Sequence, residues 1–432
     1  MMKNKFLLWI VCSLVAIPSM AQSHHSVVYD STSVVMEESG LSHVAHHVRL
    51  RMLDRKGCAS NNVLKMDYDP LSAYVEIQKV WVHRADGSTQ QIRLDVFDYV
   101  KPSRSIFWNA SQKMVQIGHL DPGDELEYVT YMKGFTYALL DDGSSDDQYI
   151  PPMRGHFYDI VPFWSNEPVA QKVYTVSVLN TKNLKYKIYG DDSQNPLSVS
   201  KTISGDRTVY TFTKRDIQPI KTERNMVASS DVFCKLLLST VPNWESKSVW
   251  FYGVNESYGS YTPTAELQAK VSELLLGAKS EFDSLNILTH WVADNMRYCG
   301  LSMGKGEGYT HHNVTMNFTD RCGVCKGKAS LLIAMLRAAG FEAYPVMTMA
   351  GSRIDDIPAD QFNHSVAVVR LKNGKFQLID PTWVPNVREL WSSAEQQQGY
   401  LIGSPEGLPL MTTPLSDPEN HYIRISGHHK IT

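Results

Sequence analysis

In the first half of the chain, apolar and polar positions alternate with a period of two. Val48, Leu50 and Met52, for example, are separated by two arginines, which is the pattern of a strand with one buried face. Similar stretches recur about every ten residues, with turn residues between them that include an Asp-Gly hairpin signal at positions 86 and 87. This spacing predicts an all-β, sandwich-like domain over residues 22–220.

Beyond residue 220 the apolar positions take the spacing of helices. One helix is predicted from Thr264 and a second over residues 281–298. Three strands are predicted after them, over residues 344–347, 365–370 and 375–379. Helices followed by antiparallel strands predict an α+β domain over residues 221–410, so the chain is expected to be multidomain. The last residues, 411–432, are expected to begin a further β segment or to form a C-terminal tail.

A glycine-rich turn brings Cys325 to the first turn of another predicted helix. Apolar residues follow at helical spacing, namely Ala329, Leu332, Ile333 and Leu336. They predict an amphipathic helix that ends at Gly340. A helix N-terminus carries a partial positive charge, and Lys326 and Lys328 lie beside Cys325 in the sequence. A thiolate at Cys325 is therefore expected to be stabilised.

A histidine and an aspartate follow Cys325 in the predicted sheet. His364 is expected to open one strand and Asp380 to close its hairpin partner, so their side chains can be cross-strand neighbours. Each of the three residues alone has an ordinary explanation as a core thiol, a strand histidine or a turn former. Together, in this order, they form a nucleophile, a base and an orienting carboxylate. Cys325, His364 and Asp380 are therefore the predicted catalytic residues.

The N-terminus has the features of a secretory signal peptide. Lys3 and Lys5 precede an apolar stretch over residues 6–17, and small residues at 19 and 21 fit a cleavage site. The apolar stretch is too short to span a bilayer. Residues 1–21 are therefore predicted to be removed from an exported protein, periplasmic or extracellular, with no stable membrane insertion after cleavage.

Composition restricts the classes of partner. The 432-residue chain has a hydrophobic content of 43% and a net charge of −3, which gives no reason to expect nucleic acid or an anionic membrane as partner. Metal and cofactor sites are not predicted. The Cys322-x-x-Cys325 spacing lacks a second pair for zinc, and His311 and His312 are assigned to a solvated loop. The sequence does not indicate an oligomeric state.

The cysteine count bears on the nucleophile. The chain has six cysteines, one of them in the predicted signal peptide, so five remain in the mature protein. An odd count in an exported protein implies at least one free thiol. A Cys322–Cys325 disulfide would consume the nucleophile, whereas a Cys299–Cys322 disulfide would leave it free. Both pairings stay open at this point.

Three motifs resemble those of the transglutaminase-like core, whose superfamily shares its helix-plus-sheet layout with papain-type proteases. They are Gly323 to Ala329, Phe362 to His364, and Leu378 to Thr382. The β-rich first half is similar to an accessory domain of unknown function that often precedes such cores in exported bacterial proteins. The family more often has an acidic residue where Val324 and Gly327 stand.

The resemblance implies a role for each catalytic candidate. Cys325 would be the nucleophile, His364 the general base and then acid, and Asp380 the orienter. The backbone N–H of Cys325 and one further donor would hold the oxyanion. The candidates for that donor are Tyr298, Tyr309 and Asn363.

The function expected from the resemblance is cleavage of an amide or peptide bond through a thioester at Cys325. Hydrolysis is favoured over protein cross-linking, because water is abundant outside the cell and nothing in the sequence marks a lysine-acceptor site. The substrate would be a peptide, a cell-wall peptide or a glycopeptide. A non-enzymatic peptide- or glycan-binding module that retains the scaffold is the alternative from another class.

Overall fold

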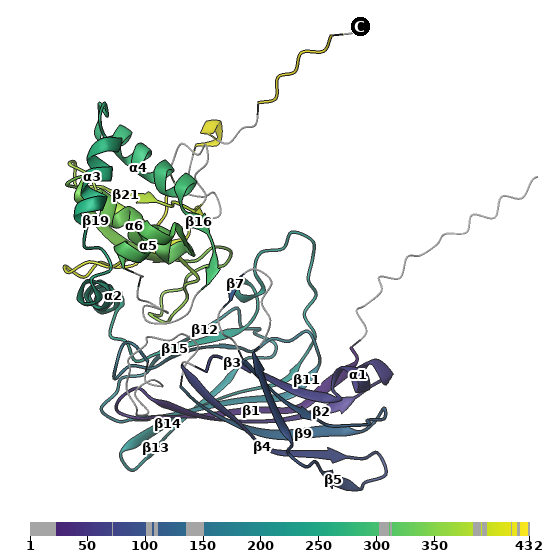
Figure 1. The fold of residues 1–432 in the computed structure, drawn as a ribbon. Helices are drawn as coiled ribbons and strands as arrows, with labels where there is room; N and C mark the ends of the chain where they lie inside the picture. Colours follow the sequence, from purple (N-terminus) through teal and green to yellow (C-terminus); the bar gives the residue numbers. More distant parts are fainter. Residues whose placement is uncertain are drawn as a thin grey trace, which may run out of the picture.

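The structure is a computed structural model that describes residues 23–70, 72–100, 106–107, 111–134, 151–301, 311, 313–382, 390, 395–415, 417–420 and 424–430. The predicted signal peptide lies outside these residues and stays a prediction. Figure 1 shows a β-rich N-terminal region and a C-terminal region of helices and strands. This architecture confirms the predicted multidomain fold, an all-β part followed by an α+β part.

An eight-stranded sheet forms most of the N-terminal region, in the order β13-β14-β11-β1-β2-β9-β4-β5. Its strands are β1 His25–Met36, β2 Ser42–Met52, β4 Ala73–His83, β5 Thr89–Gln91, β9 Glu125–Gly134, β11 Val169–Leu179, β13 Ser198–Ser204 and β14 Arg207–Ile217. All neighbours are antiparallel except β1 and β11. The predicted alternation is confirmed on β2, where Val48, Leu50 and Met52 are buried, while Arg49 and Arg51 pair with Glu125.

Two three-stranded sheets complete the second layer of this region. One contains β3 Val63–Tyr68, β8 Ser111–Gln116 and β6 Val96–Val100, and the other β10 Tyr158–Pro162, β15 Lys235–Ser239 and β12 Lys185–Tyr189. A short helix, α1 Arg55–Ser60, follows β2. Each small sheet shares a hydrophobic core with one half of the large sheet: Leu64 and Val115 pack with Val48, and Leu236 and Leu238 pack with Val34. The result is the sandwich-like arrangement that the sequence predicts.

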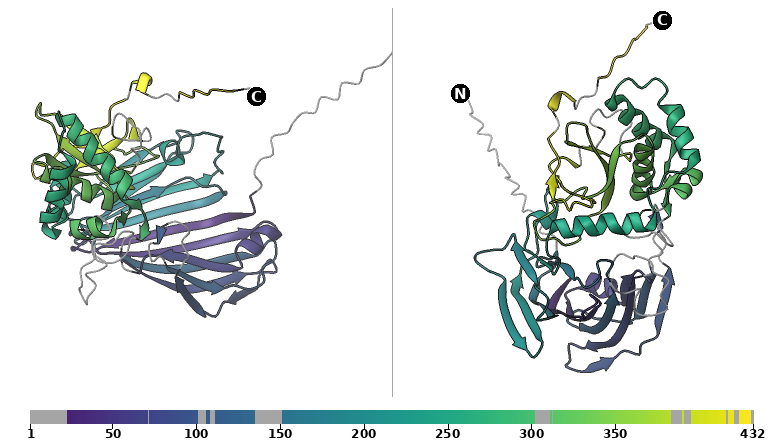
Figure 2. Two further views of the ribbon diagram at one scale, coloured as in Figure 1. Left: turned by 45° about the horizontal axis from the view of Figure 1, so that its top comes forward. Right: turned by 90° about the vertical axis from the view of Figure 1, so that its left-hand side faces the viewer.

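The C-terminal region combines helices with an antiparallel five-stranded sheet. The helices are α2 Trp244–Tyr258, α3 Ala265–Leu274, α4 Glu281–Asn295, α5 Val314–Asp320 and α6 Cys325–Ala338. The sheet order is β21-β20-β19-β22-β23, with β19 Glu342–Thr348, β20 His364–Arg370, β21 Phe376–Ile379, β22 Gly399–Ile402 and β23 Met411–Thr412. Figure 2 shows α2 lying along the junction with the N-terminal region. Within the described residues, no helix is both long and apolar enough to cross a membrane.

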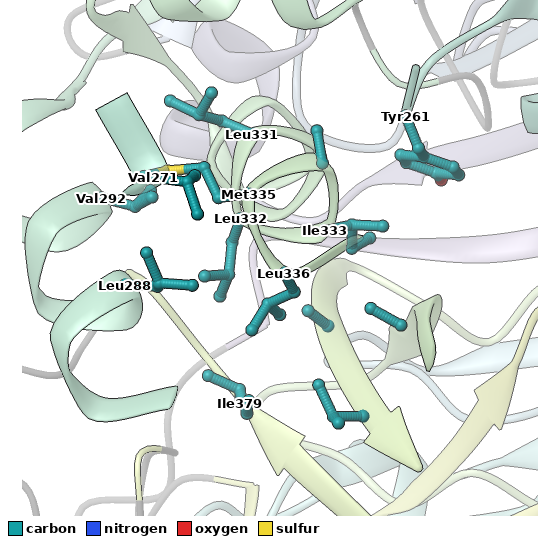
Figure 3. Packing of buried hydrophobic residues seen from close by; sticks show 14 of the residues in the cluster. Tyr261, Val271, Leu288, Val292, Leu331, Leu332, Ile333, Met335, Leu336 and Ile379 are labelled. Carbon is teal, nitrogen blue, oxygen red and sulfur yellow. The ribbon is translucent and has the colours of Figure 1, made fainter. Parts of the chain in front are cut away.

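Helix α6 is the centre of this region, and it is buried on every side. All residues from Lys326 to Leu336 are buried, and Figure 3 shows apolar side chains leaving the helix in all directions. Leu288 and Val292 lie on one side of it and Ile379 on another. The prediction of an amphipathic α6 is therefore wrong, because helices cover one side of α6 and the sheet covers the other. Its predicted end is confirmed, since Gly340 follows the last turn with a φ of +85°.

Helix α4 ends earlier than predicted. It stops at Asn295, because Met296 is extended and the chain continues as the short strand β16, Arg297–Tyr298. β16 pairs in parallel with β18, Cys322–Gly323, directly before α6. The next short strand, β17 Gly300–Leu301, pairs with β7, Ile106–Phe107, from the N-terminal region. This path carries Tyr298 along the start of α6 instead of placing it on a helix.

Strand pairing at the two ends of the C-terminal region adds to what the sequence indicated. β15 pairs with β10 and β12, so β pairing with the N-terminal region continues past the predicted boundary at residue 220. β23 pairs with β22 and thus belongs to the sheet of the C-terminal region. The described residues 424–430 are exposed and form no strand.

Candidate active site

The nucleophile candidate lies at the first position of a buried helix. Cys325 follows Val324, the N-cap residue, which makes no side-chain capping bond. The turn before it is crowded: a Cβ on Gly323 would lie 2.8 Å from Cε of Met296. A Cβ on Gly327 would lie 3.1 Å from Oδ1 of Asn317 and 3.3 Å from the same Met296 atom. A larger residue at position 327 would therefore require Met296 and Asn317 to move.

The sheet places the predicted base beside the predicted carboxylate. Nε2 of His364 lies 3.0 Å from Oδ2 of Asp380, and Asp380 is fully buried. Oδ1 of Asp380 accepts hydrogen bonds from the backbone N–H and the hydroxyl of Thr382, at 2.7 and 2.6 Å. With both oxygens occupied, the carboxylate is held in one orientation against the imidazole. The predicted His364–Asp380 proximity agrees with this geometry.

The strand register explains how these two side chains meet. Ala367 on β20 pairs with Ile379 on β21, so Asp380 is displaced along the hairpin from the position opposite His364. The two side chains therefore meet diagonally across the end of the strand pair. Such diagonal neighbours are within reach of long side chains.

The thiol and the imidazole form a charge-stabilised pair. Cys325 is half-buried. Desolvation alone would raise its pKa, but hydrogen bonding and attraction from His364 lower the pKa below the usual thiol value. The backbone N–H groups of Ser365 and Lys326 contribute in the same direction. Burial would lower the pKa of His364, but its hydrogen bonds to Asp380 and Cys325 raise that pKa to about 11. A thiolate and an imidazolium are thus favoured together.

Lys328 does not act as the sequence suggested. Lys328 is buried, and its Nζ donates to the carbonyl oxygens of Ala293 and Pro381 at 3.1 and 3.3 Å. It therefore connects α4, α6 and the turn that carries Asp380. The contributions that lower the thiol pKa come from His364 and backbone N–H groups. The backbone N–H of Lys326 at the helix start lowers the thiol pKa as predicted, but the Lys328 side chain serves other contacts.

Of the three candidates for the second oxyanion donor, Tyr298 lies at the nucleophile. Its hydroxyl lies close enough to Cys325 that both the thiol and the backbone N–H of that residue act on its ionisation. Partial burial and the nearby thiolate raise the pKa of Tyr298 to about 12, so the hydroxyl keeps its proton at neutral pH. The side chain of Asn363 is engaged with the backbone of Ala350, and Tyr309 lies outside the described residues.

A second carboxylate, which the sequence did not indicate, lies beside the catalytic histidine. Glu395 is fully buried, and its Oε1 is 3.9 Å from Nε2 of His364. His364, Asp380 and Glu395 offer ligand atoms within 4.8 Å of one another, a nitrogen and oxygen set that zinc accepts. A metal there would use the ring nitrogen that bonds Asp380, so it would compete with the His364–Asp380 contact. No local pattern around residue 395 marks it as part of a site.

The predicted solvated loop at His311 is also wrong. His311 is buried, with Nε2 2.9 Å from the Ser365 hydroxyl and Nδ1 3.2 Å from the Tyr261 hydroxyl. Because the backbone of Ser365 donates to the Cys325 thiol, His311 supports the strand that borders the nucleophile. His312 lies outside the described residues.

The remaining cysteines differ from Cys325 in their surroundings. Burial raises the pKa of Cys58 and raises that of Cys234 to about 12. Cys299 and Cys322 are reduced in the structure, and their thiols hydrogen bond each other. Burial and this neighbouring thiol raise the pKa of Cys322. Cys58, Cys234 and Cys322 thus have raised pKa values, whereas that of Cys325 is lowered.

We expect oxidation to join Cys299 to Cys322 and to leave Cys325 free. The reason is proximity: besides the contact between the two thiols, the N–H of Cys299 donates to the carbonyl of Gly323 at 3.1 Å. Such a bond would close a loop of about 20 residues, worth about 3 kcal/mol in the chain-entropy model. Peptide mapping after oxidation by glutathione disulfide checks this prediction. A Cys322–Cys325 bond in the map would contradict it.

The fold and the site together define a class. A thiol at the start of a buried helix faces a histidine and a carboxylate on an antiparallel sheet, as in thiol enzymes of the papain-like layout. Residues 38–221 match DUF3857, a domain of unknown function for which a structure has been solved, and residues 268–381 match the transglutaminase-like superfamily. The chain therefore contains a DUF3857 domain followed by a transglutaminase-like core.

One solved structure shares the fold over most of this chain. A provisionally assigned protease from Parabacteroides distasonis superimposes with a TM-score of 0.67 at 15% identity, over 91% of this chain and 72% of that one. This likeness shows the shared fold. A provisionally assigned cysteine protease from Cytophaga hutchinsonii, 13% identical, aligns over 53% of this chain and 75% of that one with a TM-score of only 0.25. No curated protein matches the chain.

Proposed function

We propose that this protein is an exported cysteine peptidase or amidase that cleaves an amide bond through a thioester at Cys325. The observation that carries the proposal is the continuous contact from the Cys325 thiol through His364 to the buried Asp380. This arrangement lowers the pKa of the thiol while it keeps the neighbouring imidazole protonated. A nucleophile and a proton donor are then ready in the same resting state.

In the first step the Cys325 thiolate attacks the carbonyl carbon of the substrate. The negative charge that develops on the carbonyl oxygen is stabilised by the backbone N–H of Cys325 and the hydroxyl of Tyr298, which lies against both atoms of the attacking residue. The imidazolium of His364 gives its proton to the leaving nitrogen as the C–N bond breaks. An acyl-thioester, a free amine and a neutral His364 result.

In the second step a water molecule resolves the thioester. His364, held by Asp380, takes a proton from the water as the oxygen attacks the acyl carbon. The C–S bond breaks, the acid product leaves, and the thiolate–imidazolium pair is restored. An amine that replaced water would give a cross-linked product instead, and we retain hydrolysis as the proposal because no described feature marks an acceptor lysine site.

The proposed substrate is a peptide, a cell-wall peptide or a glycopeptide met outside the cytoplasm. The rival proposal is a binding module that keeps the scaffold without turnover. The two differ in the reactivity of the thiol, because a scaffold does not require a lowered thiol pKa. Fold by itself does not separate them.

Selective alkylation of Cys325 tests the proposal. At limiting iodoacetamide and neutral pH, Cys325 is expected to react before Cys58 and Cys234, whose pKa values are raised. Its rate should persist as the pH falls below 8, where an ordinary thiol is protonated. The measurement is mass-spectrometric mapping of the alkylated peptides across pH, with the unfolded protein as the control. Equal labelling of all thiols in the folded protein would remove the argument for an activated nucleophile.

A further inference from the structure

The segment that leads into the catalytic histidine is attached to the N-terminal region. Residues 349–363 connect β19 to β20, and His364 is the first residue of β20. We call this segment the β19–β20 loop. Its carboxylates and carbonyls contact β12, β15 and α2, which lie outside the sheet that carries His364.

Two of these contacts are buried ion pairs. Asp355 lies 2.6 Å from Nζ of Lys235 on β15, with side-chain exposures of 12% and 6%. Asp360 pairs with Lys247 on α2, with exposures of 5% and 1%. The ammonium of Lys247 also lies 5.5 Å from the ring centroid of Tyr158 on β10. Buried charges of this kind tolerate little displacement, because a charge that loses its partner stays desolvated.

Further contacts hold the middle of the loop. The carbonyl of Asp356 accepts from Nε1 of Trp244 at 3.0 Å, and that of Pro358 accepts from the hydroxyl of Ser239 on β15 at 3.0 Å. The Asp356 carboxylate pairs with Lys187 on β12 at 2.8 Å, an exposed pair. This last pair contributes little, because solvent screens it.

The end of the loop transmits this attachment to His364. Gln361 is buried, and its side chain bonds the backbone of Asp355 and Ile357. The side chain of Asn363 bonds both backbone groups of Ala350. The chain between the Asp355 ion pair and His364 is therefore closed by internal hydrogen bonds and cannot extend freely.

We propose that the N-terminal β region acts as a positioning element for the catalytic histidine, through the Lys235–Asp355 pair and the β19–β20 loop. This inference rests on the proposed function and assigns a role to the domain of unknown function. Strand β15, which carries Lys235, is built into the sheet of β10 and β12 of that domain. The domain thereby sets the position of His364 and, through it, the ionisation of Cys325.

The test compares two double variants of the full chain. Lys235→Met with Asp355→Asn removes the proposed link without leaving a lone buried charge. Lys214→Met with Asp191→Asn is the matched control, because Lys214 is as buried as Lys235 and lies 2.8 Å from Asp191, but this pair does not touch the loop. The readout is the rate of Cys325 alkylation by iodoacetamide across pH, with thermal midpoints measured in parallel.

We expect the first double variant to alkylate Cys325 about tenfold more slowly at pH 7, with a higher pH midpoint, because a displaced His364 stabilises the thiolate less. The control should stay within about twofold of the unsubstituted protein, far below the roughly hundredfold loss that a misplacement of about 1 Å in a catalytic group can cause. The single variant Lys235→Arg, in which Asp355 is kept and the cation is retained, should show the pH profile of the unsubstituted protein.

An unchanged pH profile in a folded first variant would overturn the inference. If that variant does not fold, Asp355→Glu replaces it, since this change keeps the charge and moves the loop by one methylene; an unchanged profile there has the same meaning. Failure of the proposed function is distinguishable, because it would show as an unreactive Cys325 in the unsubstituted protein.

Discussion

Replacement of His364 by alanine is expected to reduce kcat/KM by about four orders of magnitude. His364 both stabilises the thiolate and carries the proton in each step of the proposed reaction. Without it, only the backbone N–H groups of Ser365 and Lys326 oppose the effect of desolvation on the thiol, so the pKa of Cys325 rises above that of the intact site. Alkylation at neutral pH should fall together with activity and recover only at alkaline pH.

Asp380→Asn is the companion variant and should retain measurable turnover. The carboxylate orients the imidazole and stabilises its charged form, but it takes no part in proton transfer to the substrate. The hydrogen bonds from Thr382 remain available to the Asn oxygen. Both variants are compared through kcat/KM and through the pH profile of alkylation. A His364→Ala protein with most of its kcat/KM would show that the assigned base is wrong.

Tyr298→Phe should lower kcat by about a hundredfold with little change in KM. The hydroxyl lies against the backbone N–H of Cys325 and keeps its proton at neutral pH, because its pKa is raised to about 12. The interaction with the substrate oxygen strengthens only as that oxygen gains charge, so its loss affects the transition state more than binding.

A matched control for this variant is Tyr99→Phe. Tyr99 is similarly exposed, 40% against 48% for Tyr298, and its hydroxyl bonds Gln112 in the N-terminal region. The Tyr99→Phe variant should leave both kcat and KM unchanged. A loss confined to KM in Tyr298→Phe would assign the tyrosine to substrate binding and leave the oxyanion donor open.

Much of the site was accessible from local sequence patterns. The helix start at Cys325 and the strand that begins at His364 follow from signals within a few residues of each. The same holds for the two faces of β2, because alternation along one strand reports which side is buried. Helix starts, strand starts and strand faces depend on residues close to them in the chain, so they can be predicted from the sequence.

Errors arose where the environment of an element depends on distant segments. Helix α6 has an apolar stripe, yet all its residues from Lys326 to Leu336 are buried, because residues of α3, α4, α5 and the sheet all pack around it. Lys328 has the spacing of a partner for the thiolate, but carbonyls from α4 and from the Asp380 turn take its ammonium. No periodicity within α6 encodes those neighbours.

The sequence by itself determined that an all-β part precedes an α+β part, and it singled out the three residues that resemble a thiol catalytic set. Tertiary structure alone decided that Tyr298 meets Cys325, that Glu395 lies beside His364, and that a loop ahead of the histidine is attached to the N-terminal region. The physical reason is the separation along the chain between the residues that interact. Hydrophobic period and capping act over one or two turns of chain, whereas these contacts join residues that become neighbours only when separate elements pack together.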